Sequence, residues 1–206
     1  MTNRKLVRGD FLERLKEIAR QRPAGILLRE KDLTPEEYRK LAREVQSICK
    51  KAGVPCILHS FTGVAEELEA DALHLPLPLL RKLPGEDRGR FRQLGASCHS
   101  VADAREAQSL GCTYITAGHI FDTDCKRGLP GRGLDFLREV CGAVTIPVYA
   151  IGGIEPKRMA EIFAAGAAGA CVMSGPMVCE DVGTYFADFA GAGKAAAAAV
   201  SGETEA

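Results

Sequence analysis

Short apolar runs alternate with longer amphipathic stretches along most of the chain, and this alternation limits the possible folds more than any other feature. The runs are AGILLR (24–29), PCILH (55–59), DALHLP (71–76), GASCHS (95–100), YITAGH (114–119), PVYAIGG (147–153) and AGACVMSG (168–175). Short apolar runs of this kind are typical of parallel strands buried on both faces. The stretches between them are helix-like. One has a clear start signal, with Thr34 as the N-cap, Pro35 at the first helical position and Glu37 three residues after the cap.

Repeated strand–helix units build either an open doubly wound sheet or a closed barrel. The connections are short and no GxGxxG follows the first apolar run, so the pattern favours an α/β fold of the TIM (β/α)8 barrel type. Residues 9–21 form an amphipathic helix pattern, but no convincing apolar strand precedes them. We therefore expect the first strand to be short or missing. Its neighbours would then have unpaired edges, which favours a homodimer or poor solubility.

The 206 residues fit one barrel domain over 1–190, followed by a low-complexity tail over 191–206 whose alanine run favours a frayed helix or disorder. Lys and Arg number 27 and Asp and Glu number 27, so the formal net charge is zero. This balance argues against nucleic acid or an anionic membrane as partner and favours a small molecule. No apolar run reaches the ~20 residues of a membrane span, and the start resembles no signal peptide, so we expect a cytoplasmic protein. The scattered cysteines are expected to be reduced thiols.

The loop AGHIFDTDCKRGLPGRG, residues 117–133, is the strongest candidate for chemistry. It follows the apolar run at 114–119, and barrels carry their active sites on the loops after the strands. Its glycines allow a ligand to approach the backbone, and its histidine, aspartates, lysine and arginines supply reactive groups. A solvated connector is the alternative. His119 is the candidate for proton transfer, because imidazole gives and takes protons near neutrality.

Two glycine-containing segments predict a phosphate site. Gly152 and Gly153 follow one apolar run just before a helix that starts near Pro156, and Ser174 and Gly175 repeat the arrangement after the next run. Glycine lets backbone N–H groups meet an anion, and a helix N-terminus adds its dipole. In barrels the loops after the last two strands often hold phosphate.

Two further groups of charged or ligating residues stand near the ends of the apolar runs. Arg29 and Lys31, at the end of the run 24–29, could bind a second anionic group or form a surface charge run. The four histidines, His59, His74, His99 and His119, fall near the ends of successive runs. They show no HxH or HxxxH spacing, so we expect no metal site.

Five motifs resemble one known family over nearly the whole chain, the thiamine phosphate synthase/TenI superfamily of barrels. They are LREK, HSVADA, GHIFDTDCKRGLPGRG, IPVYAIGGI and GAAGACVMSG. GHIFDTDCK is similar to the TenI branch, thiazole tautomerase, because the synthase branch typically has proline where His119 stands. The synthase branch also uses an Asn-Asp pair and a later aspartate to hold Mg²⁺ on pyrophosphate, whereas this chain has His59-Ser60 and HLPLPLL there.

The resemblance implies isomerisation of the carboxythiazole phosphate made by thiazole synthase to the aromatic form. It implies that His119 is catalytic, that Gly152, Gly153, Ser174 and Gly175 bind phosphate, and that Arg29, Lys31, Thr123 and Lys126 bind the rest of the substrate. Cys125 replaces a hydroxyl residue common in the synthase branch. No cofactor is expected, and Mg²⁺ only if the protein is a synthase. Thiamine phosphate synthase and a non-catalytic sensor of a phosphorylated ligand stay open as alternatives.

Overall fold

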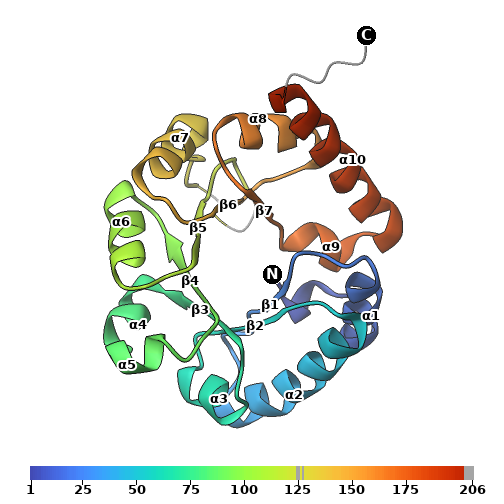
Figure 1. Cartoon of the computed structure of the whole chain (residues 1–206). Helices are drawn as coiled ribbons and strands as arrows, with labels where there is room; N and C mark the ends of the chain where they lie inside the picture. Colours follow the sequence, from blue (N-terminus) through green and yellow to red (C-terminus); the bar gives the residue numbers. More distant parts are fainter. Residues whose placement is uncertain (124–125, 127, 202–206) are drawn as a thin grey trace. The chain divides into compact units, whose positions relative to one another are not determined.

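The computed structural model describes residues 1–123, 126 and 128–201 (Figure 1). Its strands are β1 (Ile26–Leu28), β2 (Cys56–His59), β3 (Ala72–Pro76), β4 (Gln93–Cys98), β5 (Tyr114–Gly118), β6 (Val148–Ile151) and β7 (Gly169–Cys171). Their order across one sheet is the order of the chain. A barrel has this order, whereas a doubly wound sheet reverses its strand order near the middle. The fold is therefore α/β of the TIM-barrel type, as predicted. Each predicted run overlaps one strand, and β4 begins two residues before the run 95–100.

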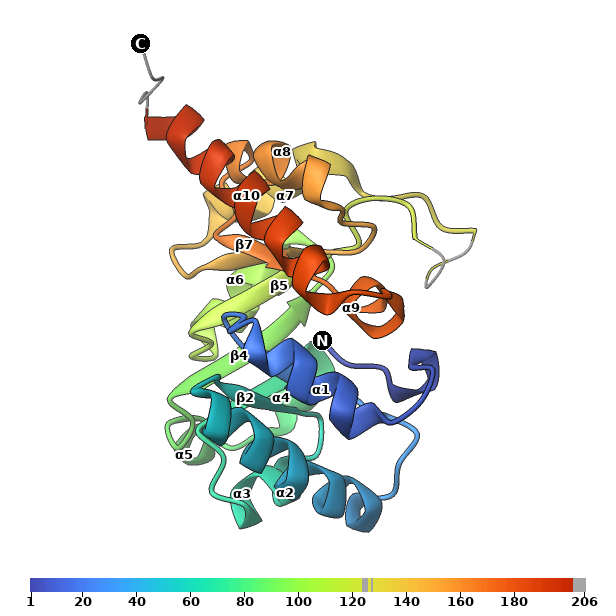
Figure 2. The same cartoon turned by 90° about the vertical axis from the view of Figure 1, so that its right-hand side faces the viewer.

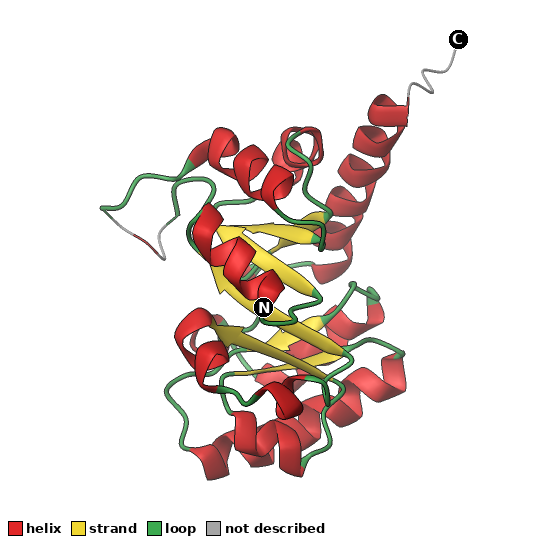
Figure 3. Ribbon diagram, turned by 60° about the vertical axis from the view of Figure 1, so that its left-hand side comes forward, coloured by secondary structure: helices red, strands yellow, loops and turns green. Residues whose placement is uncertain are grey.

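The chain divides into two units, which are described separately. The first unit comprises Met1–Gly95 and Met173–Tyr185, and the second comprises Ala96–Val172 and the residues from Phe186 onward. Pairing is parallel in both: Leu27 is opposite Ile57 in the first unit, and Thr116 is opposite Tyr149 in the second. Strands and helices alternate along most of the chain, and Figure 3 distinguishes them by colour.

The helices of the first unit are η1 (Arg4–Leu6), α1 (Phe11–Arg20), α2 (Pro35–Ala52), α3 (Thr62–Glu67), α4 (Leu77–Lys82), α5 (Gly85–Arg88) and α9 (Ser174–Val178). The helix α2 begins as predicted. The Thr34 hydroxyl accepts from the Glu37 N–H at 3.3 Å, and the Glu37 carboxylate accepts from the Thr34 N–H at 2.8 Å. Figure 2 shows α1 and α2 side by side.

The N-terminal residues take the place of a first strand. The backbone N–H of Thr2 donates to the carbonyl of Leu27, in β1, at 2.8 Å. The Thr2 side chain is buried, and its hydroxyl donates to Glu30 at 2.7 Å and accepts from the Arg29 N–H at 2.9 Å. A paired strand would form a series of backbone hydrogen bonds with β1, whereas the N-terminal residues form this single one. The prediction that strand one is short or missing is therefore confirmed.

The helices of the second unit are α6 (Val101–Ser109), α7 (Gly133–Ala143), η3 (Pro156–Arg158) and α8 (Met159–Ala164). The helix predicted near Pro156 starts with the 3₁₀ turn η3 before α8 begins. Ile115, Leu137, Val140 and Ile162 are fully buried in the core of this unit.

The last helix, α10 (Val182–Ser201), begins in the first unit and continues in the second. The predicted tail boundary at residue 191 falls inside α10, and residues 202–206 lie outside the described residues. Among the helices described, none is long and apolar enough to cross a membrane.

Candidate active site

The loops that follow β5 and β6 are joined by backbone hydrogen bonds beyond the ends of the strands. The N–H of Ile120 donates to the carbonyl of Ile151 at 2.9 Å, and the N–H of Phe121 donates to the carbonyl of Gly152 at 3.1 Å. The parallel pairing of β5 with β6 therefore continues into the segment that carries His119. This segment lies at the carboxyl ends of the strands, where barrels place their active sites.

Gly152 and Gly153 are required by this close packing. Their φ angles are +99° and +63°, in the region that favours glycine. A β-carbon at Gly152 would overlap the side chain of His119, and one at Gly153 would lie 2.8 Å from the Cβ of Phe121. The two glycines thus have a structural role in seating the loop after β5, in addition to the phosphate role predicted for them.

His119 is half-buried directly after β5, and its peptide bond to Gly118 is cis. Its carbonyl accepts from the N–H of Arg132 at 3.0 Å. Its ring Nε2 lies 3.2 Å from the carbonyl of Leu129. Because a carbonyl only accepts, Nε2 carries the proton in this contact. The backbone on both sides of His119 is thereby attached to other parts of the loop and to β6.

The rest of the loop holds the other predicted residues of the second unit. Asp122 accepts from the Gly131 N–H at 2.7 Å, which closes the loop on itself. Thr123 is half-buried, and its carbonyl accepts from the N–H of Lys126 at 2.9 Å. The Lys126 residue is exposed. Cys125, like Asp124 and Arg127, lies outside the described residues.

In the first unit, Arg29 and Lys31 stand on either side of a buried carboxylate. Glu30 is 3% exposed and accepts from the Thr2 hydroxyl, from the Arg4 backbone N–H at 3.0 Å and from the Arg4 guanidinium at 3.2 Å. Arg29 is half-buried and Lys31 is exposed. The sequence pattern predicts a binding or surface segment at LREK and does not predict that Glu30 is buried. Its partners, Thr2 and Arg4, lie 28 and 26 residues earlier in the chain.

His59 and His74 are buried opposite each other on β2 and β3, with ring centroids 5.8 Å apart. Burial, the neighbouring His74 ring and the charges of Lys31 and Arg29 lower the pKa of His59 to about 2. Burial and the N-terminal amine lower the pKa of His74 to about 3. The Ser60 hydroxyl lies 2.7 Å from Nδ1 of His59. This pair is uncharged at neutral pH and supplies no carboxylate.

Ser174 and Gly175 form the first turn of α9 rather than a loop before it. A β-carbon at Gly175 would lie 2.6 Å from Cζ of Tyr185, so the Tyr185 ring occupies the space beside this glycine. The sequence pattern could not reveal this contact, because Tyr185 lies in the next helix.

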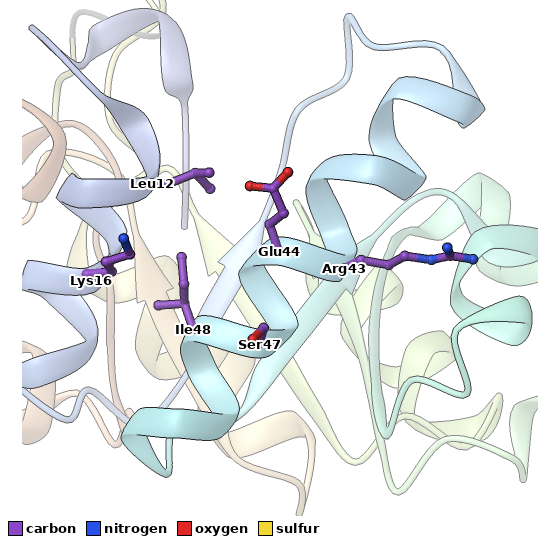
Figure 4. Close-up of a pocket in the computed structure, with 6 residues that line it drawn as sticks. All are labelled: Leu12, Lys16, Arg43, Glu44, Ser47 and Ile48. Carbon is purple, nitrogen blue, oxygen red and sulfur yellow. The ribbon is translucent and has the colours of Figure 1, made fainter.

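Two other features bear on where a ligand or a metal ion could bind. A groove of about 360 Å³ lies between α1 and α2 and is lined by Leu12, Lys16, Arg43, Glu44, Ser47 and Ile48 (Figure 4). It contains none of the predicted site residues. Within the described residues, no group of three or more His, Cys, Asp or Glu side chains is arranged to hold a metal ion.

The sequential strand order and the polar loop at the carboxyl end of β5 place the chain in the class of (β/α)-barrel proteins, whose enzymes carry their active sites on such loops. The family described as thiamine monophosphate synthase matches residues 1–175, and the chain belongs to this family of thiamine biosynthesis. The resemblance seen in the sequence motifs is thus confirmed.

Curated relatives of the chain carry the name thiamine-phosphate synthase. A thiamine-phosphate synthase of Syntrophomonas wolfei is 32% identical over 189 residues, which cover 88% of each chain. One of Moorella thermoacetica is 38% identical over 77% of this chain and 76% of its own. The solved thiamine phosphate pyrophosphorylase of Pyrococcus furiosus superposes with a TM-score of 0.81 at 26% identity and covers 95% of this chain and 94% of its own. These names agree with the synthase alternative and give no support to an isomerase.

Proposed function

We propose that the protein is a thiazole tautomerase of thiamine biosynthesis, which isomerises a carboxythiazole phosphate to its aromatic form. The observation that carries the proposal is His119, a half-buried imidazole at the carboxyl end of β5. Its carbonyl accepts from the N–H of Arg132, and the next two residues donate to the carbonyls of Ile151 and Gly152. This residue is also the one at which the sequence resembles the tautomerase branch.

The reaction moves one proton and changes no oxidation state. A proton leaves carbon 2 of the thiazole ring, and a proton arrives on the exocyclic carbon, so that the ring becomes aromatic and the atoms balance. Imidazole is the side chain best suited to take and return a proton near neutrality. His119 is assigned this role. Because only protons move, the reaction needs no redox cofactor.

The remaining roles follow the family pattern. Gly152, Gly153, Ser174 and Gly175 are assigned to the phosphate, and Lys126, Thr123, Arg29 and Lys31 to the other polar groups of the substrate. The loop after β6 supports the phosphate assignment, because Gly152 and Gly153 follow the strand directly with positive φ angles, and glycine backbone of this kind can turn its N–H groups toward an anion.

Thiamine phosphate synthase is the second candidate, and the names of the relatives favour it. That reaction releases pyrophosphate, whose charge Mg²⁺ ordinarily neutralises through oxygen ligands. At the positions where the synthase pattern has carboxylates and an amide, this chain has the buried His59, Ser60 and the leucine-rich start of α4. These residues do not fit a magnesium site, so the tautomerase is preferred.

Two assays on one preparation separate these functions. In the first, the product of thiazole synthase is added and the absorbance of the aromatic thiazole is followed. In the second, thiazole phosphate and hydroxymethylpyrimidine pyrophosphate are supplied with Mg²⁺, and thiamine phosphate is measured. We expect turnover only in the first assay. Robust thiamine phosphate formation would overturn the proposal in favour of the synthase. Binding of thiazole phosphate by calorimetry without turnover in either assay would favour a sensor.

A further inference from the structure

A second histidine, which sequence reasoning considered only as a metal ligand, touches the peptide group beside His119. His99 is the residue after β4, in the second unit, and its Nδ1 lies 2.9 Å from the carbonyl oxygen of Gly118. This carbonyl belongs to the peptide bond that joins Gly118 to His119. Because the carbonyl only accepts, Nδ1 of His99 carries the proton in this contact.

His99 is itself held in place. Its backbone N–H donates to the Asp103 carboxylate at 2.8 Å, and the Asp103 N–H donates to the Ser100 hydroxyl at 3.0 Å. Ser100 is the N-cap of α6. The start of α6 thus fixes the backbone from which the His99 ring reaches to β5.

On its other side, Gly118 packs tightly against β6. It pairs with Ile151, and a β-carbon at Gly118 would lie 2.6 Å from Cγ2 of that residue and overlap its carbonyl oxygen. The Gly118–His119 peptide is therefore held from two sides. Strand β6 packs against Gly118, and His99 binds the carbonyl oxygen of Gly118. Rotation of this peptide would move the Cα of His119 and the ring attached to it.

We propose that His99 is a positioning residue for His119. Its Nδ1–H fixes the orientation of the Gly118–His119 peptide and so places the His119 imidazole for proton transfer. This inference rests on the proposed function for the role of His119, but the hydrogen bond and its effect on the His119 ring can be tested without turnover. Small displacements of a catalytic group are costly, since about 1 Å can reduce a rate on the order of 100-fold.

The kinetic test uses two substitutions that differ in one property. His99→Ala removes the donor, whereas His99→Asn keeps an N–H donor at nearly the same reach and removes the titratable ring. We expect His99→Ala to lower kcat for the tautomerisation on the order of 10- to 100-fold with little change in KM, and His99→Asn to recover most of the loss. Equal losses in both variants would show that the imidazole itself is needed and would overturn the proposal. Turnover within threefold of wild type in both would also overturn it. Arg105→Ala, at an exposed position of α6, is the matched control.

The second test is ¹⁵N NMR of the histidine rings, which does not depend on the activity. The chain has four histidines, so His119→Gln and single substitutions assign the ring signals. We expect the neutral His99 ring to show the Nδ1–H tautomer. The His119 signals should shift in His99→Ala and return toward wild type in His99→Asn. Unchanged His119 signals in His99→Ala would overturn the positioning role. If wild type lacks tautomerase activity but the NMR shifts occur, the proposed function fails while the structural link between the histidines stands.

Discussion

A β-carbon at Gly152 would lie 2.9 Å from the Cα of His119, closer than real β-carbons approach another atom. A side chain at position 152, directly after β6, would therefore overlap His119, directly after β5. Only glycine at position 152 allows the two residues to pack this closely. The loop with the candidate catalytic residue and the loop with the candidate phosphate site are thus packed directly on each other.

Gly152→Ala should destabilise the protein. The new methyl group meets His119, and φ at this position is +99°. The unfavourable φ and the overpacking together should lower the free energy of unfolding by about 2 kcal/mol or more. Urea denaturation measures it. Gly142→Ala is the control, because this glycine lies in α7 with open space around it, and alanine there should raise stability by up to about 1 kcal/mol. Equal effects of the two substitutions would contradict the packing argument.

The strands could be predicted from the sequence because each is a short buried run bounded by turn or helix signals. The start of α2 could be predicted because Thr34, Pro35 and Glu37 form a local capping pattern. Contacts between distant residues could not be predicted. The burial of Glu30 depends on Thr2 and Arg4, and the reach of His99 to Gly118 depends on strand neighbours 19 residues apart in the chain. The partners of a polar side chain are set by the folded structure, and periodicity does not report them.

Thr2→Ala should destabilise the first unit. The Thr2 hydroxyl donates to the buried Glu30 carboxylate and accepts from the half-buried Arg29 N–H, so its loss leaves both groups with one partner fewer. The expected loss in the free energy of unfolding is about 1–3 kcal/mol. Thr2→Ser keeps the hydroxyl and should lose much less. Lys5→Ala removes an exposed ion pair to Asp32 and should leave the free energy of unfolding nearly unchanged. Urea denaturation compares the variants, and a Thr2→Ala protein as stable as wild type would contradict the prediction.

Acid should destabilise the protein partly through His59 and His74. Burial lowers the pKa of His59 to about 2 and that of His74 to about 3, whereas both take up protons near pH 6.5 once unfolded. The unfolded state therefore binds more protons below pH 6.5. Above that pH both histidines are neutral in the folded and the unfolded state, so the stability is fully present. As the pH falls from 6.5 toward 3, the free energy of unfolding declines by about 1.4 kcal/mol per pH unit for each histidine.

The comparison of wild type with His74→Gln isolates this effect from that of the carboxylates. We expect His74→Gln to be less stable at neutral pH, because a buried hydrogen-bonding group is altered. Its stability should nevertheless fall less steeply between pH 6 and pH 4 than that of wild type. Urea denaturation at several pH values gives both slopes, and parallel slopes would show that His74 is protonated in the folded protein.

His119→Gln should abolish most of the proposed tautomerase turnover without loss of the loop structure. The His119 ring donates through Nε2 to the carbonyl of Leu129 at 3.2 Å, and the glutamine amide can donate to the same carbonyl. The substitution thus keeps the polar contact and similar bulk, but an amide cannot take and return a proton near neutrality. General acid–base catalysis typically contributes 10²- to 10⁴-fold, so kcat should fall by about this factor while KM changes little. Calorimetry with thiazole phosphate serves as the control and should give nearly the wild-type affinity. A variant that turns over within threefold of wild type, roughly 0.65 kcal/mol of activation free energy, would show that the proton is carried by another group.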